Sequence, residues 1–225
     1  MDDPRRQTAF PPMQRRVVVP IRSFGRAKSR LASVLDSDQR HTLARICAES
    51  VLMRAGVDRS VVVCDDPEVA RWASDLGADV MRVESSGLNP SLQEAMPRIM
   101  ATWKPCEVVV VHADLVFPDA LQDLDVLFHG VEPTRVVVVP DRHRDGTNVL
   151  GLGSAVMEKW RFAYGPGSFD AHCEQARTLG VDLRIVEHPD LSVDLDTPED
   201  LAIDRVRVFV DAAITGTDQR AEQRN

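Results

Sequence analysis

The sequence contains only four cysteines, and no two of them stand in a CxxC motif: Cys47, Cys64, Cys106 and Cys173. Most of them lie in apolar segments, so they predict reduced core thiols in a reducing compartment rather than disulfides or a zinc site. No run of residues reaches the length of a membrane span, and residues 1–14 lack the apolar segment of a signal peptide. We therefore expect a soluble protein of the cytoplasm with no membrane partner.

The chain also lacks an excess of positive charge, since its formal net charge is -8. A general nucleic-acid-binding protein needs a broad basic face to neutralise phosphates, so this class is excluded. The histidines are scattered without the spacing of metal ligands, and no Ser/His/Asp or Cys/His set marks a covalent nucleophile. Neither a Walker loop nor a glycine-rich dinucleotide fingerprint is present. Any catalysis must therefore rest on other groups.

Apolar runs and helical patterns alternate along the chain, which has 225 residues, 44% of them hydrophobic. Strands are predicted over 17–20, 60–64, 78–83, 107–111, 135–140, 181–186 and 191–196, with a further apolar segment at 149–152. Helices are predicted over 39–55, 68–76, 91–103, 118–128 and 168–179, and after Thr197, which precedes a proline and suits a cap. This alternation indicates the α/β class, with a mostly parallel central sheet flanked by helices.

One domain accounts for a chain of this length, and no internal repeat is visible. We place the domain at residues 16–214. The two ends are polar and charged, so we expect a disordered leader over 1–15 and a disordered tail over 215–225, neither of which carries chemistry.

The segment from Val17 to Leu31, VVVPIRSFGRAKSRL, runs from a strand into a basic loop that contains Gly25. The cations of this loop are Arg22, Arg26, Lys28 and Arg30. Ligands of open α/β sheets gather at the carboxyl ends of the strands, so a basic loop there suits a polyphosphate. A solvated basic turn leading into a helix explains the pattern equally well, and these residues alone leave both interpretations open.

Three aspartates stand at the ends of apolar segments. Asp114 follows the most hydrophobic predicted strand, and Asp194 and Asp196 alternate in VDLDTP. Residues two apart in an extended segment face the same way, so the last two carboxylates can point to one place. Carboxylates without histidine or thiolate among them suit Mg²⁺, which often completes its shell with substrate phosphate. The alternative is that Asp114 is a loop residue and that Asp196 belongs to a helix-start signal.

Polar turns supply further candidates. Thr147 in DGTN and Ser168 in YGPGS stand beside glycines, where a hydroxyl and nearby N–H groups can hold a carboxylate or a phosphate. Most such turns are only turns, so their weight comes from the other motifs. Asn89 in SSGLN offers a donor and an acceptor together, which would suit a nucleotide base.

Five segments occur in a fixed order: PIRSFGRAKSRL, VHADL, DGTNVL, YGPGSFDAHCEQA and VDLDTPEDL. In this order they resemble the 2-phospho-L-lactate or phosphoenolpyruvate guanylyltransferases of coenzyme F-420 biosynthesis, from about Arg16 to Ile203. The resemblance implies a single-domain, Rossmann-like nucleotidyltransferase fold. It also implies transfer of GMP from GTP to a phosphorylated three-carbon acid, with release of pyrophosphate. The acid would be 2-phospho-L-lactate, phosphoenolpyruvate or 3-phospho-D-glycerate.

Matched motif by motif, the resemblance assigns roles to residues of this chain. GTP would be bound by Arg22, Gly25, Arg26 and Lys28 at its phosphates and by Gly87, Leu88 and Asn89 at its base. Mg²⁺ would be bound by Asp114, Asp194 and Asp196. The carboxylate and phosphate of the acceptor would be held by Thr147, Gly165 and Ser168. Lys28 and Asp114 would carry the catalysis.

Two positions depart from the family's pattern. His112 stands where a small residue or a proline is expected, and Val116-Phe117 replaces a proline-containing step. Val116 and Phe117 suit packing at the sheet edge, whereas His112 would alter the acceptor pocket. The sequence therefore leaves the identity of the acid open.

Other functions and partners follow from the same motifs. A different nucleotidyltransferase, of the molybdopterin or sugar-phosphate type, shares the basic loop, and a nucleotide-sensing domain without turnover is a further alternative. By analogy with the family, the product would pass to a downstream transferase that builds the deazaflavin cofactor. The sequence does not decide between a monomer and a homodimer.

Overall fold

The computed structural model describes residues 15–105, 107–128 and 132–222. The strands are β1 (Arg15–Pro20), β2 (Ser60–Cys64), β3 (Asp79–Arg82), β4 (Glu107–Val111), β5 (Arg135–Pro140), β6 (Thr147–Gly153) and β7 (Asp182–Ile185). The α-helices are α1 (Ser37–Ala55), α2 (Pro67–Asp75), α3 (Leu88–Trp103), α4 (Leu124–Phe128), α5 (Ser154–Met157), α6 (Ser168–Thr178) and α7 (Asp204–Glu222). The 3-10 helices are η1 (Ser29–Ser33), η2 (Val57–Arg59), η3 (Asp119–Asp123) and η4 (Pro198–Ala202).

The strands form one sheet in the order β3-β2-β1-β4-β6-β5-β7. Strand β6 runs antiparallel to both β4 and β5, and the other neighbouring strands pair in parallel. The mostly parallel α/β sheet predicted from the sequence is thereby confirmed. Because β6 runs the opposite way, its first residues lie at the same edge of the sheet as the carboxyl ends of its neighbours β4 and β5. This edge therefore collects motifs that are far apart in the sequence.

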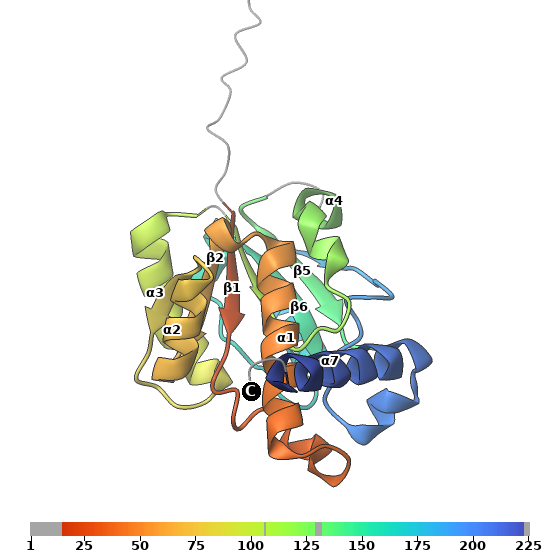
Figure 1. The fold of residues 1–225 in the computed structure, drawn as a ribbon. Coiled ribbons are helices and arrows are strands. Elements are labelled where there is room, and N and C mark those ends of the chain that lie inside the picture. The colour runs from red at the N-terminus through yellow and green to blue at the C-terminus, as the bar shows by residue number, and fades with distance from the viewer. Residues whose placement is uncertain (1–14, 106, 129–131, 223–225) are drawn as a thin grey trace, which may run out of the picture.

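Helices cover both faces of the sheet (Figure 1). Successive valines of a strand point to opposite faces, so Val17 and Val19 pack against α1 and α2, whereas Val18 packs on the face that α3 and α6 cover. Strands β1, β2, β4 and β5 are continuous valine runs because both of their faces are buried. The rigid layers hold the strand ends in place.

A separate apolar cluster joins the end of the chain to its beginning. Leu31 and Leu43, from η1 and α1, pack with Val116 and with Val206 and Val210 of α7. Helix α7 crosses α1 in Figure 1, near the carboxyl ends of the parallel strands. Phe117 packs against this cluster, so Val116 and Phe117 do have a packing role, but with η1, α1 and α7 and not with the strands of the predicted sheet edge.

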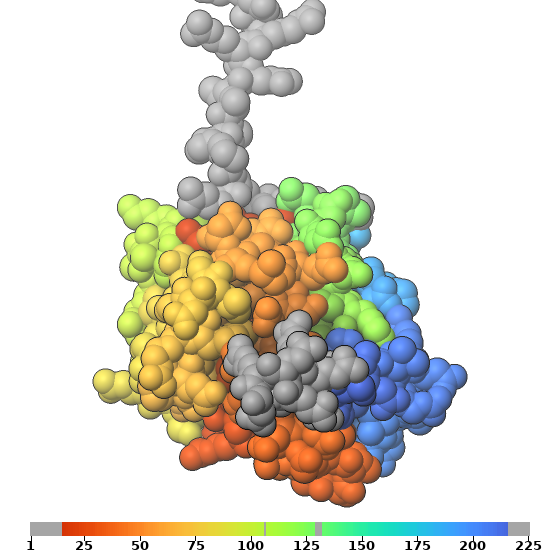
Figure 2. Space-filling model, viewed as in Figure 1, coloured from red at the N-terminus to blue at the C-terminus, as the bar shows by residue number. Residues whose placement is uncertain are grey.

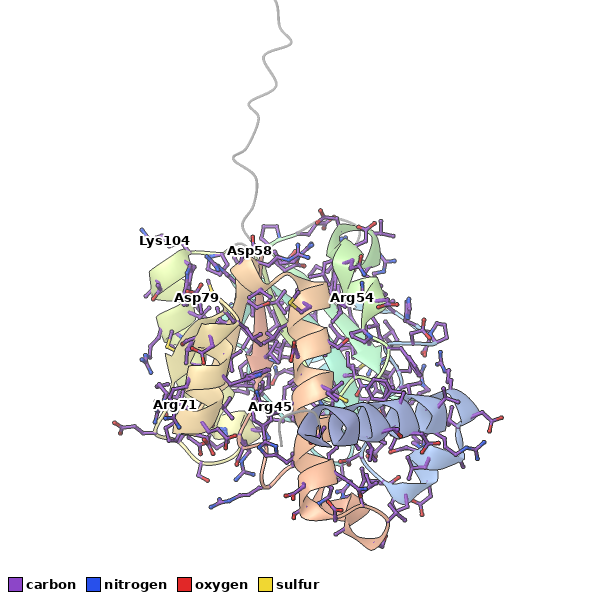
Figure 3. All side chains as sticks on the ribbon, viewed as in Figure 1. Arg45, Arg54, Asp58, Arg71, Asp79 and Lys104 are labelled. Carbon is purple, nitrogen blue, oxygen red and sulfur yellow. The ribbon has the colours of Figure 1, made fainter. Side chains whose placement is uncertain are left out.

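The outer faces of the helices carry the charges. Arg54 of α1, Arg71 of α2 and Lys104 after α3 are exposed on the surface that Figure 3 displays. Within the described residues no helix is long and apolar enough to cross a membrane. Cys47, Cys64 and Cys173 are buried free thiols, as predicted, and Cys106 lies outside the described residues.

Several predicted elements need correction. Residues 191–196 are not a strand: they form one isolated bridge, between Asp194 and Leu115. The helix predicted over 118–128 is η3 followed by α4. Thr147 opens β6 instead of ending a turn. The domain boundaries also shift, because β1 begins at Arg15 and α7 continues to Glu222. Residues 1–14 of the predicted leader and the last residues of the predicted tail, 223–225, lie outside the described residues.

Candidate active site

A cavity of about 680 Å³ opens at the carboxyl ends of β1, β2 and β4. Six residues predicted for the nucleotide and metal sites line it: Arg22, Arg26, Lys28, Leu88, Asp114 and Asp196. The remaining predicted residues lie outside its lining: Gly25, Gly87, Asn89, Thr147, Gly165, Ser168 and Asp194. The structure thus brings the basic loop and two of the three aspartates to one cavity, at the edge where α/β sheets bind ligands.

The basic loop after β1 is fixed by one aromatic side chain. Phe24 is 1% exposed and packs edge-on against Trp72 of α2, with ring centroids 4.9 Å apart. Arg22 and Arg26, on either side of it, are exposed, and neither makes an ion pair with a described residue. A buried anchor between two free cations suits a loop that presents positive charge to the cavity.

Asp66 supports this loop from the end of β2. Its carboxylate caps α2 by accepting the Glu68 N–H at 2.7 Å. Burial of the carboxyl acts to raise the pKa of Asp66, but the Glu68 N–H, the Ser23 hydroxyl and the nearby Arg26 outweigh it and lower that pKa. The loop and the first turn of α2 therefore share one ionised carboxylate.

Lys28 ties the basic loop to the acidic side of the cavity. It adopts a left-handed backbone, with φ 54°, which is uncommon for a residue other than glycine. Its side chain is buried, and Nζ donates to the main-chain carbonyl of Leu195 at 2.6 Å. Lys28 thereby holds the residue that separates Asp194 from Asp196.

Asp114 lies on the other side of the cavity, and Asp194 lies next to it, outside the cavity lining. Leu195 N donates to the carbonyl of Asp114 at 3.2 Å, and the bridge to Leu115 fixes Asp194 beside it. Burial and the negative charge of Asp114 raise the pKa of Asp194 to about 7. Asp114 Oδ1 is buried and has no hydrogen-bond partner among the described residues. Two adjacent carboxylates with an unpaired oxygen are suited to a divalent cation.

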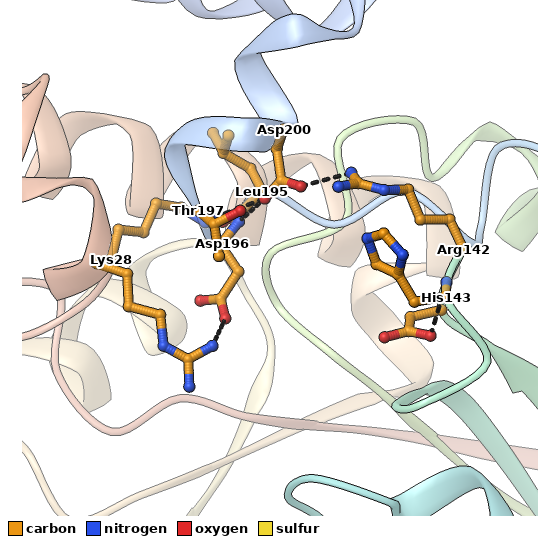
Figure 4. A network of polar contacts seen from close by, with 9 residues as sticks. Lys28, Arg142, His143, Leu195, Asp196, Thr197 and Asp200 are labelled. Carbon is orange, nitrogen blue, oxygen red and sulfur yellow. Dashed lines mark hydrogen bonds and ion pairs between the residues drawn. The ribbon is translucent and has the colours of Figure 1, made fainter.

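Asp196 is held differently. Its carboxylate accepts from Arg30 at 2.6 Å, and its N–H donates to Asp200 at 2.7 Å (Figure 4). Among the described residues no three His, Cys, Asp or Glu side chains are assembled as a metal-ligand group. The prediction that Asp194 and Asp196 point to one place together with Asp114 is therefore not met in this arrangement, because Asp196 turns to Arg30.

Asp200 organises this acidic segment. Its carboxylate accepts the N–H groups of Asp196 and Thr197 at 2.7 Å each and pairs with Arg142 at 2.5 Å, as Figure 4 shows. Burial acts to raise its pKa, but the two N–H groups and the Arg142 guanidinium prevail and lower it. The capping box of Thr197 and Asp200 confirms the predicted helix start, although the helix is the short η4.

The acceptor candidate Thr147 is buried at the first position of β6. Its hydroxyl lies 3.0 Å from Nδ1 of His172, a buried residue of α6. Burial and the neighbouring His112 lower the pKa of His172 to about 4, so its imidazole is neutral at neutral pH. The Thr147 side chain is therefore held by a neutral ring.

Gly165 and Ser168 belong to the loop that leads into α6. Ser168 is the first residue of that helix and is buried, and its N–H donates to the Gly165 carbonyl at 3.0 Å. Asp145 joins this loop to the DGTN segment, because its side chain accepts the Gly167 N–H at 3.0 Å. The backbone of Gly165 has a φ of 130°, which is strained for any other residue, although a Cβ at this position would meet open space. The two acceptor motifs are thus adjacent.

Asn89 makes two contacts that the sequence did not predict. Its Nδ2 donates to the Tyr164 carbonyl at 2.8 Å, and its Oδ1 accepts the Tyr164 N–H at 2.7 Å. The donor and acceptor assigned to the guanine base are thus engaged with the backbone of the YGPGS loop. Of the three predicted base contacts only Leu88 lines the cavity, while Gly87, with a φ of 102°, turns the chain before α3.

His112 lines the cavity near its acidic side. Its ring packs on Tyr164, with centroids 4.9 Å apart, and its Nε2 is buried without a hydrogen-bond partner among the described residues. Burial lowers the pKa of His112, although Asp114, Asp196 and Asp141 act in the opposite direction. This unusual residue therefore forms part of the cavity wall, where a small residue was expected.

Sequence reasoning missed the supporting residues Asp66, Arg142, Asp145, Asp200 and His172. The contacts of Arg142, Asp145 and His172 join segments that are distant in the chain, so no local pattern indicates them. Asp66 and Asp200 do leave local signals: Asp66 stands before Pro67 at the start of α2, and Asp200 is the third residue of the helix start at Thr197.

Comparisons with known proteins agree with this geometry. The family model described as "Guanylyl transferase CofC like" matches residues 15–207. The phosphoenolpyruvate guanylyltransferase of Rubrobacter xylanophilus is 37% identical, covering 82% of this chain and 90% of that protein. The enzyme of the same name from Sphaerobacter thermophilus is 35% identical, with coverage of 82% and 89%.

Solved structures share the fold at low sequence identity. A nucleotidyl transferase from Methanothermobacter is similar with a TM-score of 0.63 and 18% identity, covering 89% of this chain and 98% of that one. A 4-diphosphocytidyl-2C-methyl-D-erythritol synthase has a TM-score of 0.60 and 13% identity, covering 88% and 98%. Since the family model spans most of the sequence, the chain belongs to the CofC-like guanylyl transferase family and is a nucleotidyltransferase.

Proposed function

We propose that this protein transfers GMP from GTP to phosphoenolpyruvate with release of pyrophosphate, in coenzyme F-420 biosynthesis. The observation that carries the proposal is the lining of the cavity. The cations of the loop after β1 lie on one side of it, and the carboxylates after β4 and before η4 lie on the other. The names of the relatives from Rubrobacter and Sphaerobacter support phosphoenolpyruvate over 2-phospho-L-lactate and 3-phospho-D-glycerate.

GTP would enter on the basic side. Arg22 and Arg26 are exposed cations at the cavity, and Lys28 reaches its acidic side. These three residues would hold the triphosphate, and Gly25 would let the loop lie close to it. Leu88 lines the cavity and would pack on the base, with Gly87 beside it.

Mg²⁺ would be held first by Asp114 and Asp194. Asp114 Oδ1 has no hydrogen-bond partner among the described residues, and burial and the charge of Asp114 raise the pKa of Asp194, so a cation between the two carboxylates would be favourable. Mg²⁺ in phosphate-transfer sites is commonly bound by one or two carboxylates plus substrate phosphates. Asp196 would join them once Arg30 exchanges its carboxylate for a phosphate of GTP. When bound, the metal offsets charge on the phosphates.

The acceptor would bind at the amino end of β6 and the YGPGS loop. The hydroxyls of Thr147 and Ser168 and the N–H groups of the glycine loop would hold its carboxylate and phosphate. Asp145 keeps the two motifs adjacent, which suits a ligand with two anionic groups on three carbons.

The reaction would be an in-line displacement. A phosphate oxygen of the acceptor attacks the α-phosphorus of GTP, a new P–O bond forms, and the bond to pyrophosphate breaks. No protein nucleophile is needed, because positioning and electrostatic stabilisation account for most of the catalysis in such transfers. Lys28 would stabilise the negative charge that develops on the phosphates.

The test is pyrophosphate release from GTP, ATP or CTP with Mg²⁺ and each of the three phospho-acids. We expect release with GTP and phosphoenolpyruvate, and a loss of about a hundredfold or more in Asp114→Asn. Asp119→Asn, which removes an exposed carboxylate paired with Arg54, is the matched control and should be fully active. Near-normal turnover of Asp114→Asn in saturating Mg²⁺ would refute the metal assignment, and GTP binding without pyrophosphate release would refute catalysis.

A further inference from the structure

His172 is a buried polar residue to which the proposed reaction assigns no role. It is fully buried on α6, and its ring lies between Trp160 and Tyr164, at centroid distances of 5.7 and 4.9 Å. Nδ1 lies 3.0 Å from Thr147 Oγ1, and Nε2 lies 3.3 Å from Ala163 N. Both ring nitrogens are therefore engaged.

These two contacts determine the tautomer. The main-chain N–H of Ala163 can only donate, so Nε2 accepts and carries no hydrogen. The neutral ring must then carry its hydrogen on Nδ1, and this hydrogen is donated to Thr147 Oγ1. Burial favours the neutral ring at the pH of the cell, since it lowers the pKa of His172 to about 4.

The tautomer in turn orients the threonine hydroxyl. Because Oγ1 already accepts from the imidazole, its own hydrogen must point away from the ring and is available as a donor. A hydroxyl fixed in this sense suits an anionic ligand, which offers only acceptors. The opposite tautomer would instead make Thr147 donate to the ring and present a lone pair to the ligand.

Two polar groups near His172 lack hydrogen-bond partners among the described residues. The ring of Tyr164 contacts both His112 and His172, and its hydroxyl is buried without a hydrogen bond, as is Nε2 of His112. Buried polar groups in native proteins are nearly always paired, so two unpaired groups on rings in contact around Tyr164 suit a region that receives a polar ligand.

We propose that His172 is a positioning residue that fixes the Thr147 hydroxyl as a hydrogen-bond donor to the anionic acceptor. The inference rests on the proposed function, in which Thr147 binds the carboxylate or phosphate of the acceptor. His172 touches no substrate and acts only through Thr147.

Three variants separate this role from simple packing. His172→Asn places an amide near the position of Nδ1 and can still donate to Thr147. His172→Gln places its amide near Nε2 and loses that donor. Thr147→Val removes the hydroxyl that both act upon. Each variant is first checked by thermal unfolding, and then the KM values for GTP and phosphoenolpyruvate are measured by pyrophosphate release.

We expect His172→Gln to raise the KM for phosphoenolpyruvate about tenfold or more, which is typical of losing one charge-assisted hydrogen bond to the ligand. The KM for GTP should stay within about threefold of its original value. His172→Asn should recover most of the loss. The double variant Thr147→Val/His172→Gln should be no worse than Thr147→Val alone. Multiplied losses in the double variant, or equal rises in both KM values, would overturn the proposal.

A measurement on the unsubstituted protein does not depend on variants that fold poorly. Nitrogen NMR of ¹⁵N-labelled histidine distinguishes the protonated from the bare ring nitrogen of His172 at pH 7. A hydrogen on Nδ1 supports the proposal, and a hydrogen on Nε2 or on both nitrogens overturns it. If the unsubstituted protein releases no pyrophosphate with any acceptor, the proposed function fails, whereas the tautomer is read independently of activity.

Discussion

Removing the charge of Asp200 should lower the free energy of unfolding by much more than removing the charge of a surface aspartate. The carboxylate accepts two N–H groups at 2.7 Å and pairs with Arg142 at 2.5 Å. Asp200→Asn keeps the shape but leaves the guanidinium of Arg142, which is 23% exposed, without its counter-ion. Breaking a buried pair from one side costs about 3–5 kcal/mol, and partial access to water favours the lower end, about 3 kcal/mol.

Urea unfolding followed by tryptophan fluorescence measures this loss of free energy. The matched control is Asp190→Asn, which removes the exposed partner of Arg205 and should cost less than about 1 kcal/mol. The pKa of folded Asp200 is lowered, so its stabilisation is complete above the ordinary pKa of 3.8 and is lost as pH falls through the folded value. Asp200→Asn should lack this acid-dependent part. Equal losses in Asp200→Asn and Asp190→Asn would refute the reasoning.

Three further predictions concern stability and nucleotide binding. Gly153→Ala should cost about 2 kcal/mol or more in urea unfolding, because its Cβ would clash with the carbonyl of Pro133, whereas Gly25→Ala should be neutral. Lys28→Met should raise the KM for GTP about tenfold or more, and an unchanged KM would contradict the proposed contact with the phosphates. The free energy of unfolding should fall by up to about 1.4 kcal/mol per pH unit between pH 6.5 and about 4, because His172 is protonated there in the unfolded chain but not in the folded one. His172→Asn should reduce this dependence on pH.

The sequence predicted the sheet well because its strands are buried on both faces and read as continuous valine runs. The bounds of β2, β4 and β5 match the predicted ones. It failed at 191–196, where alternating apolar residues pack against the turn after β4 without forming a ladder. Alternation of apolar and polar residues indicates which side chains are buried. A segment whose backbone is held by side chains such as Asp200 can show this alternation without pairing as a strand.

The parts of the site that depend only on residue type and on strand order could be predicted from the sequence. Cations after β1 and an aspartate after β4 meet at the cavity because parallel strands bring their carboxyl ends to one edge. The sequence did not indicate that Asn89 bonds to the Tyr164 backbone, because a side chain with a donor and an acceptor fits a backbone amide as well as a base. No spacing rule connects residues that far apart, so only the folded chain reveals the clamp on Tyr164.

The reversed direction of β6 has a consequence for how acceptor preference can change. The residues proposed to meet the acceptor, Thr147, Gly165 and Ser168, fall within one continuous stretch, 147–168, because a hairpin returns the chain to the same rim. The residues proposed to hold the triphosphate fall within 22–30, on the far side of β4. The residues proposed to bind the acceptor acid and those proposed to bind the GTP phosphates therefore lie in separate segments of the sequence. Replacing 147–168 with the segment of a relative that uses another acceptor would leave the loop after β1 unchanged, provided that the backbone of Tyr164 still meets Asn89.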